Sequence, residues 1–548
     1  MDDTGPGQEI DAALAAGDVH RACAIAERAL AGGAGLDDPL LYNLAAWQCV
    51  HDGAFEAAHA WLQRGLAIAP GDPGLLTTLG LALRRQGRIG EALATLDGVV
   101  ALAPAYAAAW AERGFALDHG GSLRLAEASY RRAADLDPGS AAALARVASI
   151  AARQGDAETG RDFASRALAI DPGDIMAGLA LARSDIALAR GDVALARGDV
   201  TGGAAAAVDR LGGLLARSDI GADDRIAALS LFGTALDRLG DSDAAYAAFA
   251  ASNTAFAVRY TPADNTRETH RRFVERIDHA VAARDAAAWH GPADREARCG
   301  HAFLLGYPRS GTTLVENILA SVPGVAVLEE RPTLRDADLA FLGPSDGLAR
   351  LARLDAAGFA EYRAAYWRRV ADFGGDTAAR LFVDMDPLKG LKLPLILPLF
   401  PAAHIIVMRR DPRDVVWSCF RQDFAASAAA LDFTSLDDTA RHYDAFMRLQ
   451  EHCLVASGRP SLTLRYETLV ADFDAETRRL CEFLGLAWTP AVRDFSTTAR
   501  HREIATASVG QVRQGLYDGA GQWRRYARQL EPVLAVLTPW IELFGYRT

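Results

Sequence analysis

Residues 302–331 read AFLLGYPRSGTTLVENILASVPGVAVLEER. The apolar run 302–306 has the length and composition of a β-strand. The next residues, 307–311, contain the Pro, Ser and Gly of a tight loop. Thr312 and Thr313 then place hydroxyls at the start of a predicted helix over 312–320. A strand, a glycine-bounded loop and a helix start together predict an anion site, because the loop N–H groups and the positive helix end point to the same place.

The cation of this loop separates it from an ATP-binding loop. Gly306 and Gly311 have the spacing of P-loop glycines, but Thr312 stands where a nucleotide triphosphatase needs Lys to reach the β- and γ-phosphates. The cation here is Arg309, inside the loop, which suits a phosphate or sulfate group. The alternative interpretation is a glycine loop that only turns the chain.

The motif Pro-Arg-Ser-Gly-Thr-Thr-Leu resembles the 5′-phosphosulfate loop of sulfotransferases, specifically of their protein-tyrosine sulfotransferase-like branch. The resemblance covers about residues 300–547. It implies an α/β P-loop-like domain, in which a parallel sheet has helices on both faces, and the donor 3′-phosphoadenosine 5′-phosphosulfate. The donor-binding residues that it implies in the loop are Arg309, Ser310, Gly311, Thr312 and Thr313.

Length and composition set broad limits on the protein. A chain of 548 residues predicts two domains or more, and a net charge of -12 argues against general nucleic-acid binding. The six scattered cysteines form no CxxC pair, which favours a reducing compartment over a disulfide framework or a metal site. The acidic first residues are unlike a signal peptide, and no apolar stretch of about twenty residues predicts a membrane span. We therefore expect a soluble cytoplasmic protein without a metal.

Two series of residues with a 34-residue period run through the first half of the chain. This period predicts tetratricopeptide repeats, each with two helices. The glycine of each unit turns the chain between the paired helices, and a small residue five positions later lets the helices cross closely. The two series are Pro70, Pro104, Pro138 and Pro172, and Gly53, Gly87, Gly121 and Gly155.

The period is less regular at both ends of the array. Gly17 marks a first unit, and a tandem ALARGDV at 187–193 and 194–200 interrupts the spacing before Gly240 and Ala245 restore it. We expect about six repeats in a curved solenoid, preceding the sulfotransferase-like domain as an all-α region.

Three parts of the chain follow from these patterns. We predict the repeat solenoid over residues 1–260, a connecting helix and linker over 261–299, and the sulfotransferase-like domain over 300–548. The repeats are expected to bind a peptide or protein, either the acceptor or a partner. A passive spacer or a self-association module is the alternative.

Two glutamates follow the second predicted strand, over 325–328. Ligands of a doubly wound sheet gather beyond the carboxyl ends of its strands, so a carboxylate here can lie beside the anion loop. The resembling family has paired glutamates at this spacing, and the resemblance implies that the second, Glu330, is the general base. Glu329 has no assigned role. In the alternative interpretation both glutamates are solvated or paired with Arg331 or Arg335.

One position departs from the family. Its Asp-Lys-x-Pro stretch has a Lys that helps to hold the transferring group, and the aligned position within DMDP (384–387) is Met385. This departure leaves open whether the domain is fully active. Lys389 or Lys392 is a candidate replacement, and either is equally well interpreted as an exposed lysine.

A second phosphate-binding signature follows the strand predicted over 404–408. Residues 409–414 read RRDPRD, and Ser418 lies eight positions after Arg410. Sulfotransferases carry such an R-D-P-R…S signature to hold the 3′-phosphate of the donor, through a charge-assisted hydrogen bond and a hydroxyl. The resemblance therefore implies this role for Arg410 and Ser418, with a structural ion pair as the alternative for Arg410. A second arginine of the family's helix aligns with Gln422, beside Arg421.

Three further positions come from the resemblance alone. Tyr466, the last residue of the strand predicted at 462–466, is expected near the adenosine, although a core tyrosine would look the same in sequence. Ser508 lies where the family keeps a serine near the sulfonyl group, and it joins Glu330 and Arg309 as a catalytic candidate. Gln522 stands where a basic residue near the nucleotide phosphate is common.

Taken together, the patterns favour a sulfotransferase that moves a sulfonyl group to an acceptor hydroxyl of a protein tyrosine, a glycan or a small molecule. The absence of Lys after Gly311 and of an evident magnesium-binding aspartate argues against the alternative of a P-loop kinase. Another alternative is a repeat scaffold with an inactive, donor-binding transferase domain, which Met385 and Gln522 support. The acceptor, the oligomeric state and the ligand of the repeats stay open.

Overall fold

The computed structural model describes residues 6–189, 202–262, 268–282, 289–293, 299–502, 515–516 and 519–547. They belong to two compact units, Met1–Ala187 and Leu188–Thr548. Ser508 and most of the tandem ALARGDV segment lie outside the described residues. Within the described ranges, no helix combines the length and the apolar character needed to cross a bilayer.

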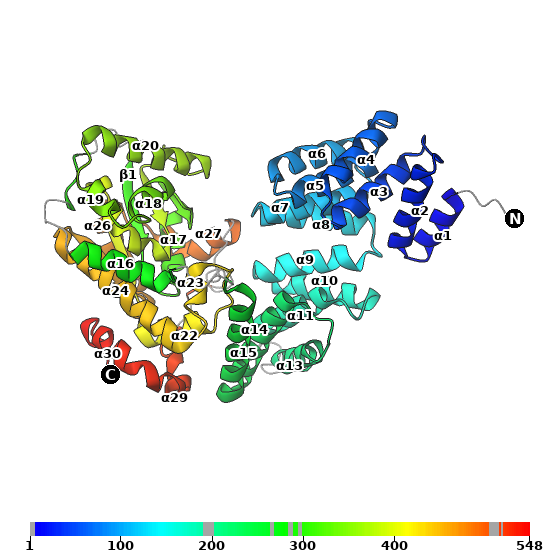
Figure 1. Cartoon of the computed structure of the whole chain (residues 1–548). Helices are drawn as coiled ribbons and strands as arrows, with labels where there is room; N and C mark the ends of the chain where they lie inside the picture. The colour runs from blue at the N-terminus through cyan, green and yellow to red at the C-terminus, as the bar shows by residue number, and fades with distance from the viewer. Residues whose placement is uncertain are drawn as a thin grey trace. The chain divides into compact units, whose positions relative to one another are not determined.

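The first unit is a stack of helix pairs (Figure 1). The glycines of the 34-residue series lie between the helices of a pair with left-handed φ values of 75°, 78°, 79° and 82° at Gly53, Gly87, Gly121 and Gly155. This confirms the repeats. The helices are α1 (Pro6–Ala15), α2 (Val19–Ala31), α3 (Pro39–His51), α4 (Phe55–Ile68), α5 (Pro73–Arg85), α6 (Ile89–Leu102), α7 (Ala107–His119), α8 (Leu123–Leu136), α9 (Ala141–Arg153), α10 (Ala157–Ile170) and α11 (Ile175–Leu188).

The predicted small residues lie where helices of the stack meet. Ala58, Ala92 and Ala126 are fully buried. A Cβ at Gly160, the fourth member of the series, would lie 2.5 Å from Ser184 Oγ. Larger side chains at these positions would force the helices apart, which explains why the sequence repeats small residues here.

The second unit contains a five-stranded parallel sheet in the order β2-β3-β1-β4-β5. The chain passes from the central strand β1 to one side of the sheet and then crosses to the other. Because all five strands are parallel, their carboxyl ends lie at the same edge of the sheet, where ligands of such sheets bind. The strands are β1 (Gly300–Leu305), β2 (Val325–Glu329), β3 (Leu381–Met385), β4 (His404–Arg409) and β5 (Ser461–Arg465).

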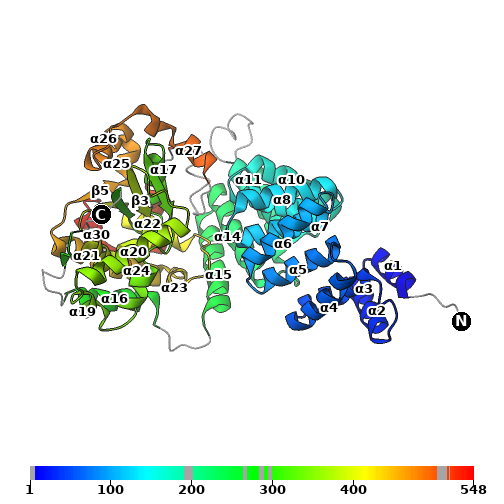
Figure 2. The same ribbon diagram turned by 90° about the horizontal axis from the view of Figure 1, so that it is seen from above.

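Helices cover both faces of this sheet, as the sequence predicted. Ala302 and Leu304 of β1 pack in one apolar cluster with α17 (Thr312–Ala320), and Phe303 and Leu305 pack in another with α21 (Leu393–Leu399) and α24 (Leu436–Ser457). Figure 2 shows α17, α25 and α26 on one side of the strands and α24 and α16 on the other.

The remaining helices of the second unit surround the sheet and its loops. They are α13 (Gly202–Leu215), α14 (Ala222–Leu239), α15 (Ser242–Tyr260), α16 (His270–Ala282), α18 (Arg335–Phe341), α19 (Gly347–Leu351), α20 (Ala356–Asp372), η2 (Pro387–Lys392), α22 (Pro412–Phe420), α23 (Ala428–Leu431), α25 (Tyr466–Ala471), α26 (Phe473–Phe483), η3 (Pro490–Asp494), α27 (Phe495–His501), η4 (Gln522–Tyr526), α29 (Ala527–Leu530), η5 (Glu531–Val533) and α30 (Leu534–Leu543).

The helix pair α14–α15 packs against the sheet-bearing part of the second unit. Gly240, with a φ of 85°, turns the chain between the two helices, as the restored repeat pattern predicted. Phe249 of α15 lies edge-on to Trp417 of α22, with ring centroids 5.9 Å apart, in the same apolar cluster as β1. Asn253 Nδ2 donates a hydrogen bond of 2.8 Å to the carbonyl of Phe420.

Candidate active site

The loop between β1 and α17 is built around two glycines. Gly311 has a φ of 102° at the N-cap of α17, and a Cβ there would lie 2.8 Å from Cδ2 of Tyr466. A Cβ at Gly306 would lie 2.9 Å from Cγ2 of Thr312. Ser310, Thr312 and Thr313 are buried. The N–H groups at the start of α17 lie at the positive end of the helix, so this end of the loop suits an anion.

Arg309 and Glu330 have an unusual backbone. Their φ values are 71° and 44°, and they are the residues other than glycine with positive φ in the described part of the chain. Such a conformation costs on the order of 1–3 kcal/mol and persists only where the surroundings enforce it, most often at functional sites. Both residues were selected from the sequence as catalytic candidates, so the backbone singles them out a second time.

Arg309 connects the loop to the signature that follows β4. Its Nε donates to Ser418 Oγ at 3.1 Å, and Arg410 Nη1 donates to the Arg309 carbonyl at 3.1 Å. Burial lowers the pKa of Arg309 to about 10, and the nearby charges of Arg421 and Arg410 act in the same direction. The guanidinium still carries its charge at neutral pH, which makes the buried loop strongly cationic.

Arg410 lies over the ring of Tyr466, with Cζ 4.8 Å from the ring centroid. Its Nη2 donates to the carbonyl of Gly519 at 2.5 Å, and the N–H of Gly519 donates to the Tyr466 hydroxyl at 3.3 Å. The buried Nε of Arg410 has no hydrogen-bond partner among the described residues. The structure thus brings Arg410 and Tyr466, from the ends of β4 and β5, to the loop that holds Arg309.

Glu330 follows β2 at the same edge of the sheet, and its N–H donates to the Met385 carbonyl at 2.7 Å. Its side chain keeps an exposed edge, yet the protein that crowds it raises its pKa to about 7. The negative charges of Asp386 and Glu329 add to this increase, whereas Lys389 and Arg309 oppose it. Glu330 is therefore close enough to Arg309 to interact electrostatically, and it exchanges its proton near neutral pH.

Asp386 and Glu316 are acidic neighbours of Glu330 for which no sequence motif predicted a role. Asp386 follows β3 and accepts a hydrogen bond of 2.9 Å from the N–H of Leu388, which caps η2. The strand-end argument that selected Glu330 also selects Asp386. Glu316 is fully buried on α17 and pairs with Arg502 at 2.8 Å. Its burial, followed by the charge of Glu329, raises its pKa.

Met385, at the family's lysine position, packs inside the apolar cluster that contains α17 and is fully buried. Lys389 is 1% exposed, and its ammonium forms an ion pair with Asp384 and donates to the Arg331 carbonyl at 3.3 Å. The interpretation of Lys389 as an exposed lysine is therefore wrong. Lys392 instead pairs with Asp338 at 2.6 Å, so Lys389 is the lysine whose charge reaches Glu330.

The other predicted positions are more peripheral. Gln522 begins η4, in a segment held by Asp414, which accepts hydrogen bonds from the N–H groups of Gly521 at 2.6 Å and Trp523 at 2.9 Å. Gln422 donates to the carbonyl of the adjacent Asp423 at 3.2 Å. Ser508 lies outside the described residues, so its assignment stays a prediction.

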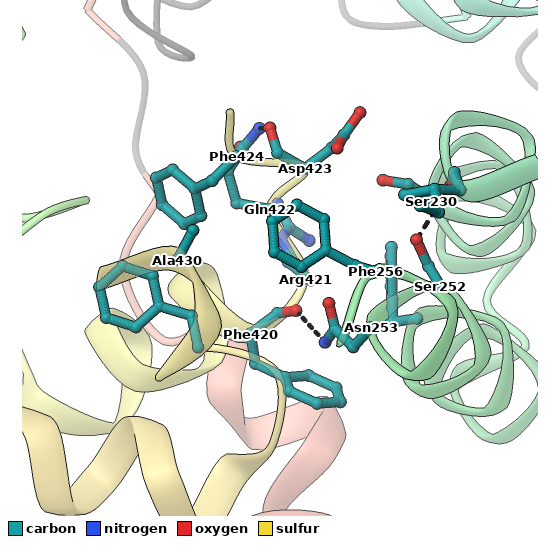
Figure 3. A pocket seen from close by; sticks show the side chains of 13 residues that line it. Ser230, Ser252, Asn253, Phe256, Phe420, Arg421, Gln422, Asp423, Phe424 and Ala430 are labelled. Carbon is teal, nitrogen blue, oxygen red and sulfur yellow. Dashed lines mark hydrogen bonds between the residues drawn. The ribbon is translucent and has the colours of Figure 1, made fainter. Parts of the chain in front are cut away.

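A small cavity lies beyond the end of α22 (Figure 3). This helix ends two residues after Ser418. Its empty space is about 350 Å³, partly open to solvent, and its walls come from α14, α15, α23 and the loop after α22. Figure 3 shows the rings of Phe256, Phe420 and Phe424 around it, with Arg421 on the loop. The cavity places the repeat-like helices directly beside the helix that carries Ser418.

Comparison with protein families bears on both parts of the chain. Residues 302–490 match the model of the sulfotransferase family, and residues 77–141 and 116–175 match the tetratricopeptide repeat. The chain carries tetratricopeptide repeats followed in sequence by a sulfotransferase-family domain. The matched range begins in β1 and includes Arg309, Glu330, Arg410, Ser418 and Tyr466.

Several curated proteins resemble this chain over part of its length. An uncharacterised protein of Aquifex aeolicus (strain VF5) is 31% identical over 245 residues, which are 43% of this chain and 32% of the relative. Protein-tyrosine sulfotransferase 1 of Danio rerio is 29% identical over 35% of this chain and 54% of its own length. Protein-tyrosine sulfotransferase A of Caenorhabditis elegans is 26% identical over 35% and 51%. The chain thus spans about half the length, or less, of these relatives.

Solved structures resemble the chain over part of its length. A thermophilic tetratricopeptide-repeat protein of Thermus thermophilus is 22% identical, over 33% of this chain and 96% of that one, with a TM-score of 0.29. The pilF protein of Pseudomonas aeruginosa is 14% identical over 41% and 94%, with a TM-score of 0.33.

Proposed function

We propose that this protein transfers a sulfonyl group from 3′-phosphoadenosine 5′-phosphosulfate to an acceptor hydroxyl. The observation that supports this most is the convergence of Arg309, Arg410 and Ser418 around one glycine-bounded loop. Glu330 lies at the same edge of the sheet, after β2, which is separated from β1 by β3 alone. The buried Nε of Arg410 suits an anionic ligand, and the missing side chains of Gly306 and Gly311 let Thr312 and Tyr466 pack closely against the loop.

The donor supplies an activated sulfonyl group, and the chain supplies charge and position. In this proposal, the N–H groups where the loop meets α17 and the Arg309 guanidinium stabilise negative charge at the 5′ side of the donor. Arg410 and Ser418 bind the 3′-phosphate through charge-assisted and hydroxyl hydrogen bonds. Tyr466, whose ring faces Arg410, orients the nucleoside.

Glu330 acts as the general base in this proposal. A hydroxyl is a weak nucleophile until its proton is accepted, and a base is most effective when its pKa lies near the working pH. The pKa of about 7 that crowding and the charge of Asp386 give to Glu330 meets that condition. Lys389, held by Asp384, supplies the positive charge that the family places at the position of Met385.

The repeats are proposed to recruit the acceptor or a partner protein. Tetratricopeptide repeats present extended surfaces on which peptides bind, and two of the relatives are named protein-tyrosine sulfotransferases. A protein tyrosine is therefore the first acceptor to test, before a glycan or a small hydroxylated compound.

Isothermal titration calorimetry tests the donor. The protein should bind adenosine 3′,5′-bisphosphate at least tenfold more tightly than ATP, because Thr312 replaces the lysine that would reach a γ-phosphate. Equal or tighter binding of ATP would refute the proposal and favour the kinase alternative.

Met385 supports a second candidate function, a repeat scaffold whose transferase domain binds the donor without turnover. Its side chain packs in an apolar cluster, where the family has a lysine. In that case the wild type would bind adenosine 3′,5′-bisphosphate but transfer no sulfonyl group to any acceptor. Activity gained by Met385→Lys would then identify this position as the cause.

A further inference from the structure

Two histidines and an aspartate from distant parts of the chain meet beside the donor loop. His270 begins α16, Asp432 follows α23, and His442 lies within α24. One nitrogen or oxygen atom of each residue lies within 4.8 Å of those of the other two. His270 Nδ1 and His442 Nε2 are 2.7 Å apart although the residues are 172 positions apart in sequence. In Figure 1, α16 and α24 lie beside one another, as their contacts require.

We propose that His270, Asp432 and His442 bind a divalent transition-metal ion of the zinc type. Two imidazole nitrogens and one carboxylate oxygen are a common ligand set for Zn²⁺, which takes a water molecule as its fourth ligand. Zn–N bonds of about 2.0–2.1 Å require the two nitrogens to separate by roughly 0.6 Å from their present contact. A rotation of the half-buried His270 side chain is enough for that.

The surroundings of His442 match those of a metal ligand. A ligating histidine donates its other ring N–H to an acceptor, which fixes the ring and leaves the remaining nitrogen for the metal. His442 Nδ1 lies 2.7 Å from the hydroxyl of Tyr307, whose oxygen can accept that bond. His442 is fully buried, and the ring of Phe433 packs edge-on against it at 5.3 Å. The ring therefore has one available orientation, with Nε2 toward His270.

Asp432 is oriented in a similar way. It is 8% exposed, and its Oδ2 accepts a hydrogen bond of 2.7 Å from the N–H of Arg271. This bond fixes the carboxylate at the first turn of α16, next to His270. The carboxylate of an aspartate has further lone pairs, so it can accept this bond and bind a metal at once.

The charged groups that face the cluster are largely balanced. Lys392 and Arg271 are the cations near the two histidines, and each pairs with an acid, Asp338 at 2.6 Å and Glu275 at 3.1 Å. Asp438 and Glu275 face Asp432. A divalent cation at this point therefore meets no uncompensated positive charge.

The site would fasten the connecting helix α16 to the sulfotransferase domain. Tyr307 lies two positions before Arg309, so the hydroxyl that orients His442 belongs to the donor loop itself. No sequence pattern indicated this site, because its ligands follow no short spacing and the expectation from the cysteines was a protein without a metal. The proposal is independent of the reaction that the domain catalyses.

Titration of the metal-free full-length protein with Co²⁺, followed by visible absorption, tests the proposal. Co²⁺ replaces Zn²⁺ in such sites, and only a four-coordinate site gives its intense visible bands. The wild type should bind one equivalent with these bands, and His270→Ala should lose them. His279→Ala is the matched control, since His279 is an exposed histidine on the same helix and should bind as the wild type does.

Asp432→Asn provides a second variant that keeps the side-chain shape and the bond from Arg271. It should weaken Co²⁺ binding about tenfold or more. Zn²⁺ should raise the Tm of the wild type and of His279→Ala, and of neither ligand variant. Wild-type protein without the bands, or bands that persist in both His270→Ala and Asp432→Asn, would overturn the proposal. Circular dichroism on each variant confirms that the comparison is between folded proteins.

Discussion

At the scale of single residues, Arg309 and Glu330 combine a strained backbone with opposite charges at the edge of the sheet. The left-handed φ of Glu330 redirects the chain at the end of β2, and its N–H is held by the Met385 carbonyl. This places the carboxylate near Asp386 and Glu329, whose charges raise its pKa. A carboxylate with a pKa of about 7 accepts a proton at neutral pH, which a glutamate with an ordinary pKa does poorly.

Glu330→Gln should lower kcat about a hundredfold or more, because it removes the proton acceptor and keeps the shape. In the wild type, kcat should rise with pH through about 7, since Glu330 accepts a proton only when it is ionised. The variant should lose this rising limb, while its affinity for adenosine 3′,5′-bisphosphate stays unchanged. A pH profile of kcat for both proteins measures this.

Glu329→Gln is the control for that measurement. Because the charge of Glu329 raises the pKa of Glu330, its removal should shift the rising limb to lower pH and leave the plateau of kcat nearly unchanged. Normal turnover in Glu330→Gln would show that another group is the base.

Arg410→Ala should weaken binding of adenosine 3′,5′-bisphosphate by about 1.5–3 kcal/mol, the range for a lost hydrogen bond to a charged group. Binding of 5′-AMP, which lacks the 3′-phosphate, is the control and should change little. Calorimetry with both nucleotides separates the two effects. An equal loss for both ligands would mean that Arg410 only supports the loop through the Arg309 and Gly519 carbonyls.

Sequence alone could predict which residues of the short local motifs lie together. The residues 309–313 and the pair Arg410 and Ser418 belong to these motifs, and the structure places them together. The sequence could not reveal that Lys389 forms a buried ion pair with Asp384, since that pair depends on how η2 packs against β3. The cluster of His270 and His442 was hidden for the same reason, because only tertiary packing joins α16 to α24.

At the scale of elements, the helix pair α14–α15 supports the end of α22. Asp237 of α14 is 5% exposed. It accepts a hydrogen bond of 2.6 Å from the hydroxyl of Tyr526 and pairs with Arg421 at 3.1 Å. Arg421 follows α22 directly, three residues after Ser418, so these contacts fix the helix that carries the predicted 3′-phosphate ligand.

Asp237→Asn should therefore lower the free energy of unfolding of the second unit by about 1.5–3 kcal/mol, as for a lost charged hydrogen bond. Asp243→Asn is the matched control on α15, because its partner Arg528 is as exposed as Asp243 itself and exposed ion pairs contribute little. Urea denaturation followed by tryptophan fluorescence of the second unit measures both. Equal stability of the two variants would contradict the supporting role of Asp237.

The boundaries of most elements followed from local patterns. The helix expected over 312–320 is α17, and the strands expected at 325–328 and 404–408 differ from β2 and β4 by one residue. Strand β3 begins at Leu381, where its register with β1 and β2 starts.

At the scale of the whole molecule, the place at which the chain is cut decides what a truncation tests. Deletion of residues 1–201 leaves α14 and α15 in place and should preserve binding of adenosine 3′,5′-bisphosphate. Deletion of residues 1–260 removes Phe249 from its contact with Trp417 and Asp237 from Arg421, and should lower the stability of the remaining domain. Circular dichroism melting and calorimetry on both truncations measure this, and identical melting of the two would contradict it.

The shorter truncation also tests the role of the repeats. If they recruit the acceptor, the protein without residues 1–201 should still modify a small generic hydroxyl compound and should lose the native acceptor. An equal loss of both activities would assign the repeats a purely structural role.

The transfer itself is measured most directly with donor that carries ³⁵S in its sulfonyl group. The full-length protein is incubated with this donor and an extract of the cells that produce it, beside Glu330→Gln as the matched control. The account predicts label on an acceptor, formation of adenosine 3′,5′-bisphosphate in equal amount, and about a hundredfold less of both with the variant. Wild-type protein that binds the donor and leaves every acceptor unlabelled would contradict the account.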